Sequence, residues 1–135
     1  MAVPSPSLLT TWEMAYRLVS ATVLGGLLGL DRELKHKPAG ARTHALVALG
    51  AAAAALMVIE FPASGMTFDA NALTRVIQGI LTGIGFLGAG VIMRAEREHT
   101  IHGLTTAASI WVVACLGIAC GAGRWRVALI TAALS

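Results

Sequence analysis

The sequence predicts an all-α polytopic membrane protein, a helical bundle of four full spans plus a partial fifth. Hydrophobic side chains make up 56% of the 135 residues and charged side chains 13%, whereas a soluble domain carries about 25% charged residues. The mean hydropathy is +0.75, and polar residues cluster between long apolar runs. A single core inside a charged shell cannot be built from this pattern, which argues against a soluble enzyme, a disordered tail and a secreted disulfide scaffold.

The first apolar run spans a bilayer only if its helix begins early. The stretch from Arg17 to Leu30 gives about 20 Å of helix, less than a hydrocarbon core of about 30 Å. We therefore predict a span over about 12–30, with Trp12 in the interfacial belt and Arg17 snorkelling outward. The segment lacks a basic stretch before it and a persuasive cleavage site, so we expect a retained span rather than a signal peptide.

Three further apolar runs are near spanning length. They cover about 45–61, 76–93 and 104–123. Residues 127–135 follow and give about 14 Å of helix, too little to cross, which predicts a partial fifth span. We treat 1–135 as a single transmembrane domain whose chain stops inside its fifth helix.

The distribution of Lys and Arg predicts the orientation. The first and third connections hold six basic residues and the opposite side holds four. Because basic loops tend to remain in the cytoplasm, we expect the N-terminus outside and these two loops inside. No dense basic stripe with interleaved aromatic residues occurs, so the expected partner is the lipid bilayer and not nucleic acid.

Small residues spaced four apart predict tight helix packing, since they let backbones approach closely in lipid. The glycines at this spacing are Gly25, Gly29, Gly79, Gly83, Gly117 and Gly121, and the glycine-rich segment GIGFLGAG adds Gly85 and Gly88 as expected packing positions. Glycine is also simply common in membrane helices, but three helices share the spacing, which favours packing and a symmetric homodimer. Residues 18–58 also weakly resemble those 63 positions later. This repeat predicts two tandem helical hairpins with paired cytoplasmic ends.

Polar residues near the helix ends are the candidate binding residues. The first loop region contains LGGLLGLDRE and AGARTHALVALGA, and its polar residues include Asp31, Arg32, Glu33, Arg42, Thr43 and His44. Both signs of charge meet there, which predicts a site for a ligand, ion or partner. The alternative is ordinary interfacial anchoring through mutual ion pairs, the default arrangement at span ends.

Two later segments add polar candidates. Gln78 lies one turn before Thr82 beside GIGFLGAG, where it would line a path or seal a helix crossing by hydrogen bonds. GLTTAASIW places Thr105, Thr106 and Ser109 in the first turns of the fourth helix. These hydroxyls either cap that helix or, with Arg42 and Arg94 close by, favour an anionic group. On the second reading, Arg42, Asp31 and Thr105 converge on one cavity.

No catalytic, metal or cofactor site is expected. The four histidines lack a structural-zinc pattern, and the acidic residues near the first and third loops would attract Mg²⁺ only loosely. Cys115 and Cys120 are about 8 Å apart on a helix, too far for a disulfide. Walker, dinucleotide and nucleophile–base motifs are missing from the sequence.

Four motifs in order, LGGLLGLDRE, AGARTHALV, GIGFLGAGVIMR and GLTTAASIW, resemble the N-terminal membrane domain of the MgtC/SapB family. The resemblance covers the chain from about Trp12 onward. It implies a bacterial inner-membrane protein of about five spans, and many members continue into a small cytoplasmic domain. Asp31 stands where the family often has Glu, and His44 and Thr105 where some members have Asn.

The resemblance also implies a function. It implies a role in adaptation to low magnesium, through an influence on membrane energetics rather than by carrying Mg²⁺. The family's functional positions correspond to Asp31, Arg32, Glu33, Arg42, Thr43, the glycines of GIGFLGAG, Thr105 and Thr106. We therefore expect a non-enzymatic protein that binds a ligand or a membrane-protein partner at its cytoplasmic face. The alternative is a small ion or solute transporter or channel that acts as an oligomer.

Overall fold

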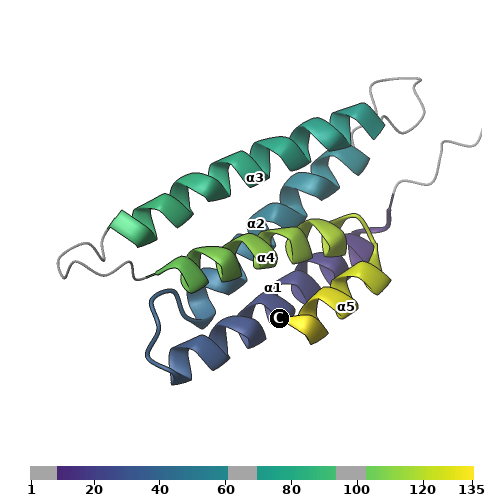
Figure 1. The fold of residues 1–135 in the computed structure, drawn as a ribbon. Coiled ribbons are helices and arrows are strands. Elements are labelled where there is room, and N and C mark those ends of the chain that lie inside the picture. Colours follow the sequence, from purple (N-terminus) through teal and green to yellow (C-terminus); the bar gives the residue numbers. More distant parts are fainter. Residues whose placement is uncertain (1–8, 61–69, 94–102) are drawn as a thin grey trace, which may run out of the picture.

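The computed structural model describes residues 9–60, 70–93 and 103–135 (Figure 1). The helices are α1 (Thr11–Leu34), α2 (Ala41–Glu60), α3 (Ala70–Met93), α4 (Leu104–Gly121) and α5 (Trp125–Leu134). No strand occurs in these ranges. The all-α prediction is confirmed for the described part of the chain.

The helix ends differ from the predicted spans because hydropathy marks the hydrocarbon-crossing part of a helix and not its ends. The first helix continues to Leu34 and the second begins at Ala41, so both carry charged residues beyond their apolar runs. The third helix begins at Ala70 instead of near residue 76, and the fourth ends at Gly121 instead of near residue 123. Polar turns of this kind are tolerated outside the hydrocarbon.

Three helices are long and apolar enough to cross a membrane: Ala41–Glu60, Ala70–Ile92 and Leu104–Gly121. The 24 residues of α1 suffice in length, but charged residues lie toward both of its ends, and its crossing stays a prediction. The predicted count of four full spans is therefore not confirmed. With 10 residues, α5 reaches about 15 Å and is too short to cross.

The fourth helix lies at the centre of the bundle. It packs against α1, α2, α3 and α5, and α1 also packs against α2 (Figure 1). Of its most apolar segment 56% is buried, against 6% for α3. Val113, Leu116 and Cys120 from α4 pack with Ala21 of α1 and Ala48 of α2 in the main core. The helix pairs α1–α2 and α3–α4 thus lie together as in the predicted hairpins.

Four of the predicted packing glycines lie at helix contacts. A Cβ atom on Gly25 would lie 2.7 Å from the Ala48 Cβ, and one on Gly29 would lie 2.6 Å from the Gly40 carbonyl oxygen. At Gly117 the same atom would lie 2.9 Å from the Ala48 Cα and still closer to its carbonyl oxygen. Gly121 stands in the same relation to Ala52. For these positions the packing prediction is confirmed.

The glycines of α3 behave differently. No atom lies within 4 Å of a Cβ built on Gly79, Gly83 or Gly85, whereas one on Gly88 would lie 3.3 Å from the Ala107 Cβ. Direct contact within the bundle is therefore not seen for the first three, and Gly79 and Gly83 instead line a cavity of about 380 Å³ between α3 and α2. The reason is that α3 contacts the bundle through a different face, its large apolar residues Leu73, Ile77, Ile80 and Leu81.

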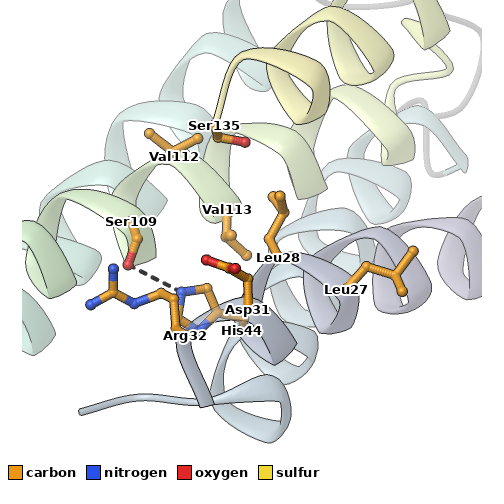
Figure 2. Close-up of a pocket in the computed structure, with 9 residues that line it drawn as sticks. All are labelled: Leu27, Leu28, Asp31, Arg32, His44, Ser109, Val112, Val113 and Ser135. Carbon is orange, nitrogen blue, oxygen red and sulfur yellow. Dashed lines mark hydrogen bonds between the residues drawn. The ribbon is translucent and has the colours of Figure 1, made fainter. Parts of the chain in front are cut away.

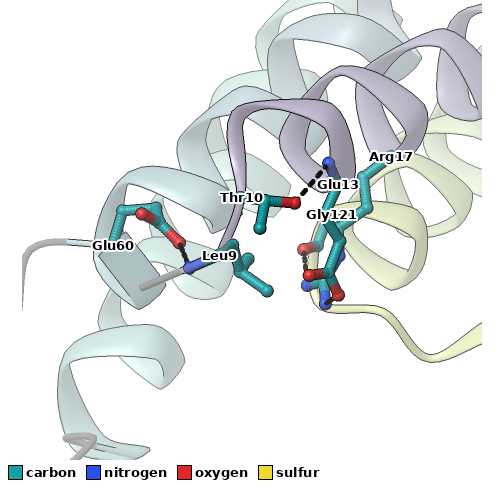
Figure 3. A network of polar contacts seen from close by, with 6 residues as sticks. All are labelled: Leu9, Thr10, Glu13, Arg17, Glu60 and Gly121. Carbon is teal, nitrogen blue, oxygen red and sulfur yellow. Dashed lines mark hydrogen bonds and ion pairs between the residues drawn. The ribbon is translucent and has the colours of Figure 1, made fainter. Parts of the chain in front are cut away.

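At the end where α4 terminates, the Arg17 side chain reaches the last turn of that helix (Figure 3), and its predicted snorkelling stays a prediction. Its side chain is 13% exposed. The guanidinium donates to the Gly121 carbonyl at 2.9 Å and pairs with Glu13 at 3.2 Å. Carbonyls in the last turn of a helix lack intrahelical partners and carry partial negative charge, so they attract the cation. Nearby, Glu60 accepts a hydrogen bond from the Leu9 backbone at 3.1 Å.

The α2–α4 contact predicts a large cost for a single methyl group. In Gly117→Ala the new Cβ would overlap the Ala48 backbone, so α4 must move away from α2. We expect destabilisation by about 1–3 kcal/mol, measured by chemical unfolding in detergent. The control Gly50→Ala meets no atom within 4 Å, and the better helix propensity of alanine should leave stability equal or higher. Equal stabilities of the two variants would contradict this contact.

Candidate functional site

The α1–α2 connection fixes the charged end of α1. The amides of His36 and Lys37 donate to the carbonyls of Glu33 and Arg32, each at 3.0 Å. This pair of bonds forms a Schellman cap, with His36 in the left-handed conformation at φ 54°. The Glu33 carboxylate in turn accepts from the Ala41 amide at 2.9 Å, which caps the start of α2.

The carboxylates of Asp31 and Glu33 both have partners near the α1–α2 connection. Asp31 forms an exposed ion pair with Lys35 at 2.8 Å. Glu33 is bound to the α2 backbone. The predicted ion pairing among the loop charges does not include Arg32, whose side chain contacts α4 instead.

Four of the predicted site residues meet between α1, α2 and α4, and we call Arg32, His44, Thr106 and Ser109 the polar cluster. The Arg32 guanidinium donates to the Thr106 hydroxyl. The His44 ring bridges two helices, with Nδ1 3.0 Å from the Gly40 carbonyl and Nε2 3.1 Å from the Ser109 hydroxyl (Figure 2). Both His44 and Thr106 are buried.

The hydrogen bonds of His44 determine its tautomer. A carbonyl only accepts, so Nδ1 carries hydrogen toward Gly40, and Nε2 of the neutral ring accepts from Ser109. The Ser109 hydroxyl also lies 2.8 Å from the Thr106 carbonyl. It has one hydrogen and serves one acceptor at a time. Protonation of His44 would reverse the bond to Ser109 and free that hydrogen for Thr106.

Arg32 is under-satisfied within the described residues. Its Nε atom is buried and has no hydrogen-bond partner there. The ion pairs found in the described ranges join Arg17 to Glu13 and Lys35 to Asp31, so Arg32 is absent from them. An unpaired donor on a buried charged group costs about 1–3 kcal/mol or more, which favours binding of an acceptor.

A cavity of about 220 Å³ adjoins the cluster. Its lining residues are Leu27, Leu28, Asp31, Arg32, His44, Ser109, Val112, Val113 and Ser135. Figure 2 shows the side chains of Arg32, His44 and Ser109 on one side and those of Leu27 and Leu28 on the other, with the Asp31 carboxylate between the two groups. The cavity thus has a polar wall and an apolar wall.

The other predicted site residues lie apart from this cavity. Arg42, Thr43 and Thr105 are exposed, and Thr43 lines a separate cavity of about 520 Å³ with Phe86 and other residues. The expected convergence of Arg42, Asp31 and Thr105 is wrong: Asp31 alone of the three lines the cavity. Successive helical residues point about 100° apart, so Thr106 faces inward where Thr105 faces outward.

Two further candidates remain outside the cluster. Gln78 is exposed on α3. Arg94 lies outside the described residues. Sequence reasoning also missed the apolar wall of the cavity and the Gly40 carbonyl. Leu27 and Leu28 stand one turn before Asp31 and Arg32, a spacing that indicates their shared face but not the helix opposite them.

The described residues include no group of three or more His, Cys, Asp or Glu side chains placed to hold a metal ion. The polar cluster offers two hydroxyls, an imidazole and a guanidinium. This set binds acceptors and suits an anionic group better than a cation.

Comparison with known proteins gives the family. The profile of the MgtC family matches residues 18–135. The chain belongs to the MgtC family. It is 41% identical to Protein SrpB of Synechococcus elongatus over 123 residues, which cover 87% of this chain and 68% of SrpB.

Relatives named Protein MgtC are similar at the same level. Identity is 44% with that of Salmonella typhimurium over 83% of this chain and 45% of the relative. It is 42% with that of Brucella abortus over 78% of this chain and 41% of the relative. The chain therefore spans less than half the length of these MgtC relatives. No solved structure matches it.

The cluster predicts different effects for two adjacent threonines of this family member. Thr106→Val keeps the side-chain volume but removes the acceptor of Arg32. We expect it to lower the free energy of unfolding by about 1–3 kcal/mol. The exposed Thr105→Val should change stability by less than about 0.5 kcal/mol. Chemical unfolding of both variants in the same detergent measures the difference. Equal losses of unfolding free energy in the two variants would show that the Arg32–Thr106 bond does not stabilise the protein.

Proposed function

We propose that this chain is a non-enzymatic MgtC-type protein of the bacterial inner membrane that supports growth at low magnesium and acts on membrane energetics. In this proposal the N-terminus lies outside, and a ligand or membrane-protein partner binds at the cytoplasmic end. The names of the relatives support the link to the MgtC family. The excess of basic residues in the first and third connections supports the orientation.

One observation carries the binding role. Arg32 brings a charge into the polar cluster, yet its Nε has no partner among the described residues. A purely structural bond between helices would be satisfied by neutral groups at lower desolvation cost. An under-satisfied cation beside a cavity is more typical of a binding site.

Growth of a bacterium deleted for its own MgtC-family gene tests this role. We expect the wild-type chain to restore growth in low-magnesium medium and Arg32→Gln to lose most of that restoration. The matched control is Lys37→Gln, which removes one charge from the exposed connection at the same end. Membrane abundance of each variant is measured by immunoblot.

Two outcomes would contradict the proposal. Full restoration of growth by a well-expressed Arg32→Gln variant would show that the polar cluster is not needed for the function. Ion flux into proteoliposomes that disappears in Gln78→Leu would favour the transporter alternative instead.

We further propose that the protein forms a homodimer through the outer face of α3. Arg75, Gln78, Thr82, Gly85 and Ala89 recur at intervals of three and four residues, and all five are exposed. A glutamine amide both donates and accepts, so Gln78 can pair with its own copy across a twofold axis. Gly85 lets a second backbone approach, since no atom lies within 4 Å of its Cβ position.

Cysteine cross-linking checks the dimer. In a variant whose native cysteines are alanine, Gln78→Cys should form disulfide-linked dimers in membranes under mild oxidation. Val23→Cys is a control, because Val23 is 51% exposed on α1 and away from α3. Equal cross-linking at both positions would indicate random collision, and none at Gln78 would argue against this interface.

A further inference from the structure

We propose that the cavity beside the polar cluster binds the phosphate group of an anionic phospholipid. The inference rests on the proposed function, because it names the ligand class of the same site. It is carried by three observations: an under-satisfied guanidinium, a positive helix end beside it, and an apolar wall that continues from the polar one.

The charges at the site favour an anion. Arg32 contacts Thr106, which lies in the first turn of α4, where free amides carry partial positive charge. Two positive contributions therefore meet at one place. Asp31 also lines the cavity, but its carboxylate is bound to Lys35 at 2.8 Å. The Nε is buried and closed to a ligand, so a phosphate oxygen would accept from the terminal NH groups where Arg32 lines the cavity, and arginine is well suited to hold phosphate in this way.

The order of the lining residues matches the order of a lipid molecule. The chain of α1 approaches this end of the bundle and that of α4 leaves it. Residues before Arg32 on α1 and after Ser109 on α4 therefore both lie deeper in the proposed membrane. Those positions hold Leu27 and Leu28 on one helix and Val112 and Val113 on the other, and Ser135 after α5 adds one hydroxyl to this mainly apolar part. A polar headgroup followed by hydrocarbon fits this gradient.

The size of the cavity also favours part of a larger molecule. Sites that enclose a whole small-molecule ligand usually measure about 300–1,000 Å³. The present cavity, at about 220 Å³, is smaller. It has room for a phosphate and the adjoining glycerol, with the acyl chains lying outside among the helices. A free phosphate ion would leave the apolar wall unused.

Binding to the purified 135-residue chain in a neutral detergent tests the proposal. The probes are phosphatidylglycerol, diacylglycerol with the same chains, and inorganic phosphate, each measured by native mass spectrometry or thermal shift. We expect phosphatidylglycerol to bind and diacylglycerol to bind at least about tenfold more weakly, since it lacks the group that Arg32 would hold. Arg32→Gln should lose about tenfold in affinity for phosphatidylglycerol, and Lys37→Gln should match the wild type.

A second pair of variants covers the case in which Arg32→Gln does not fold. Leu27 is 58% exposed and lines the cavity, so Leu27→Asn should fold and weaken phosphatidylglycerol binding. Val23→Asn, one turn earlier and also exposed, should not. Equal affinity of the wild type and Arg32→Gln, or of Leu27→Asn and Val23→Asn, would overturn the proposal. If inorganic phosphate bound as tightly as phosphatidylglycerol, the site would be one for the free ion and not for a lipid headgroup.

The growth assay separates this inference from the proposed function. If Arg32→Gln loses growth at low magnesium but retains its lipid affinity, the cluster acts on another ligand and the lipid inference fails. If lipid affinity falls while growth is restored in full, the lipid site is supported and the proposed function fails.

Discussion

The backbone contact between α2 and α4 is the constraint on which the rest of the structure depends. Gly117 and Gly121 let α4 lie directly against Ala48 and Ala52. Lipid offers no hydrophobic driving force between helices, so such close packing stabilises the bundle. Thr106 lies about three turns before Gly117 on the same face of α4. The close approach of α4 to α2 at these glycines therefore also determines where Thr106 lies relative to Arg32.

The two arginines of α1 sit in opposite electrostatic settings. Arg17 meets the last carbonyls of α4, where a cation is favourable. Arg32 meets the first turn of the same helix, where a cation is unfavourable unless an anion joins it. One end of α4 is thus satisfied within the chain. At the other end, the Arg32 guanidinium lacks an anionic partner among the described residues and lies beside a cavity, so the binding role is assigned there.

Sequence reasoning recovered what depends on composition and local spacing. It predicted the helical class, three helices apolar enough to cross a membrane, and the close contacts at Gly25, Gly29, Gly117 and Gly121. It failed where the answer depends on which helix lies opposite. Thr105 and Thr106 are equal candidates in the sequence, because a rotation of about 100° decides which of the two faces inward. The α3 glycines have the spacing of a packing face, yet the larger side chains of α3 make its contacts within the chain.

The paired anchors of α1 and α4 have a mechanical consequence. Arg17 and Arg32 are 15 residues apart, and so are the positions they hold, Thr106 and Gly121. The two antiparallel helices are thereby fixed in axial register at both ends. A slide of one turn would break both anchors at once, so these helices should travel as a rigid pair. By contrast, only 6% of the most apolar segment of α3 is buried, so most of that helix faces away from this pair.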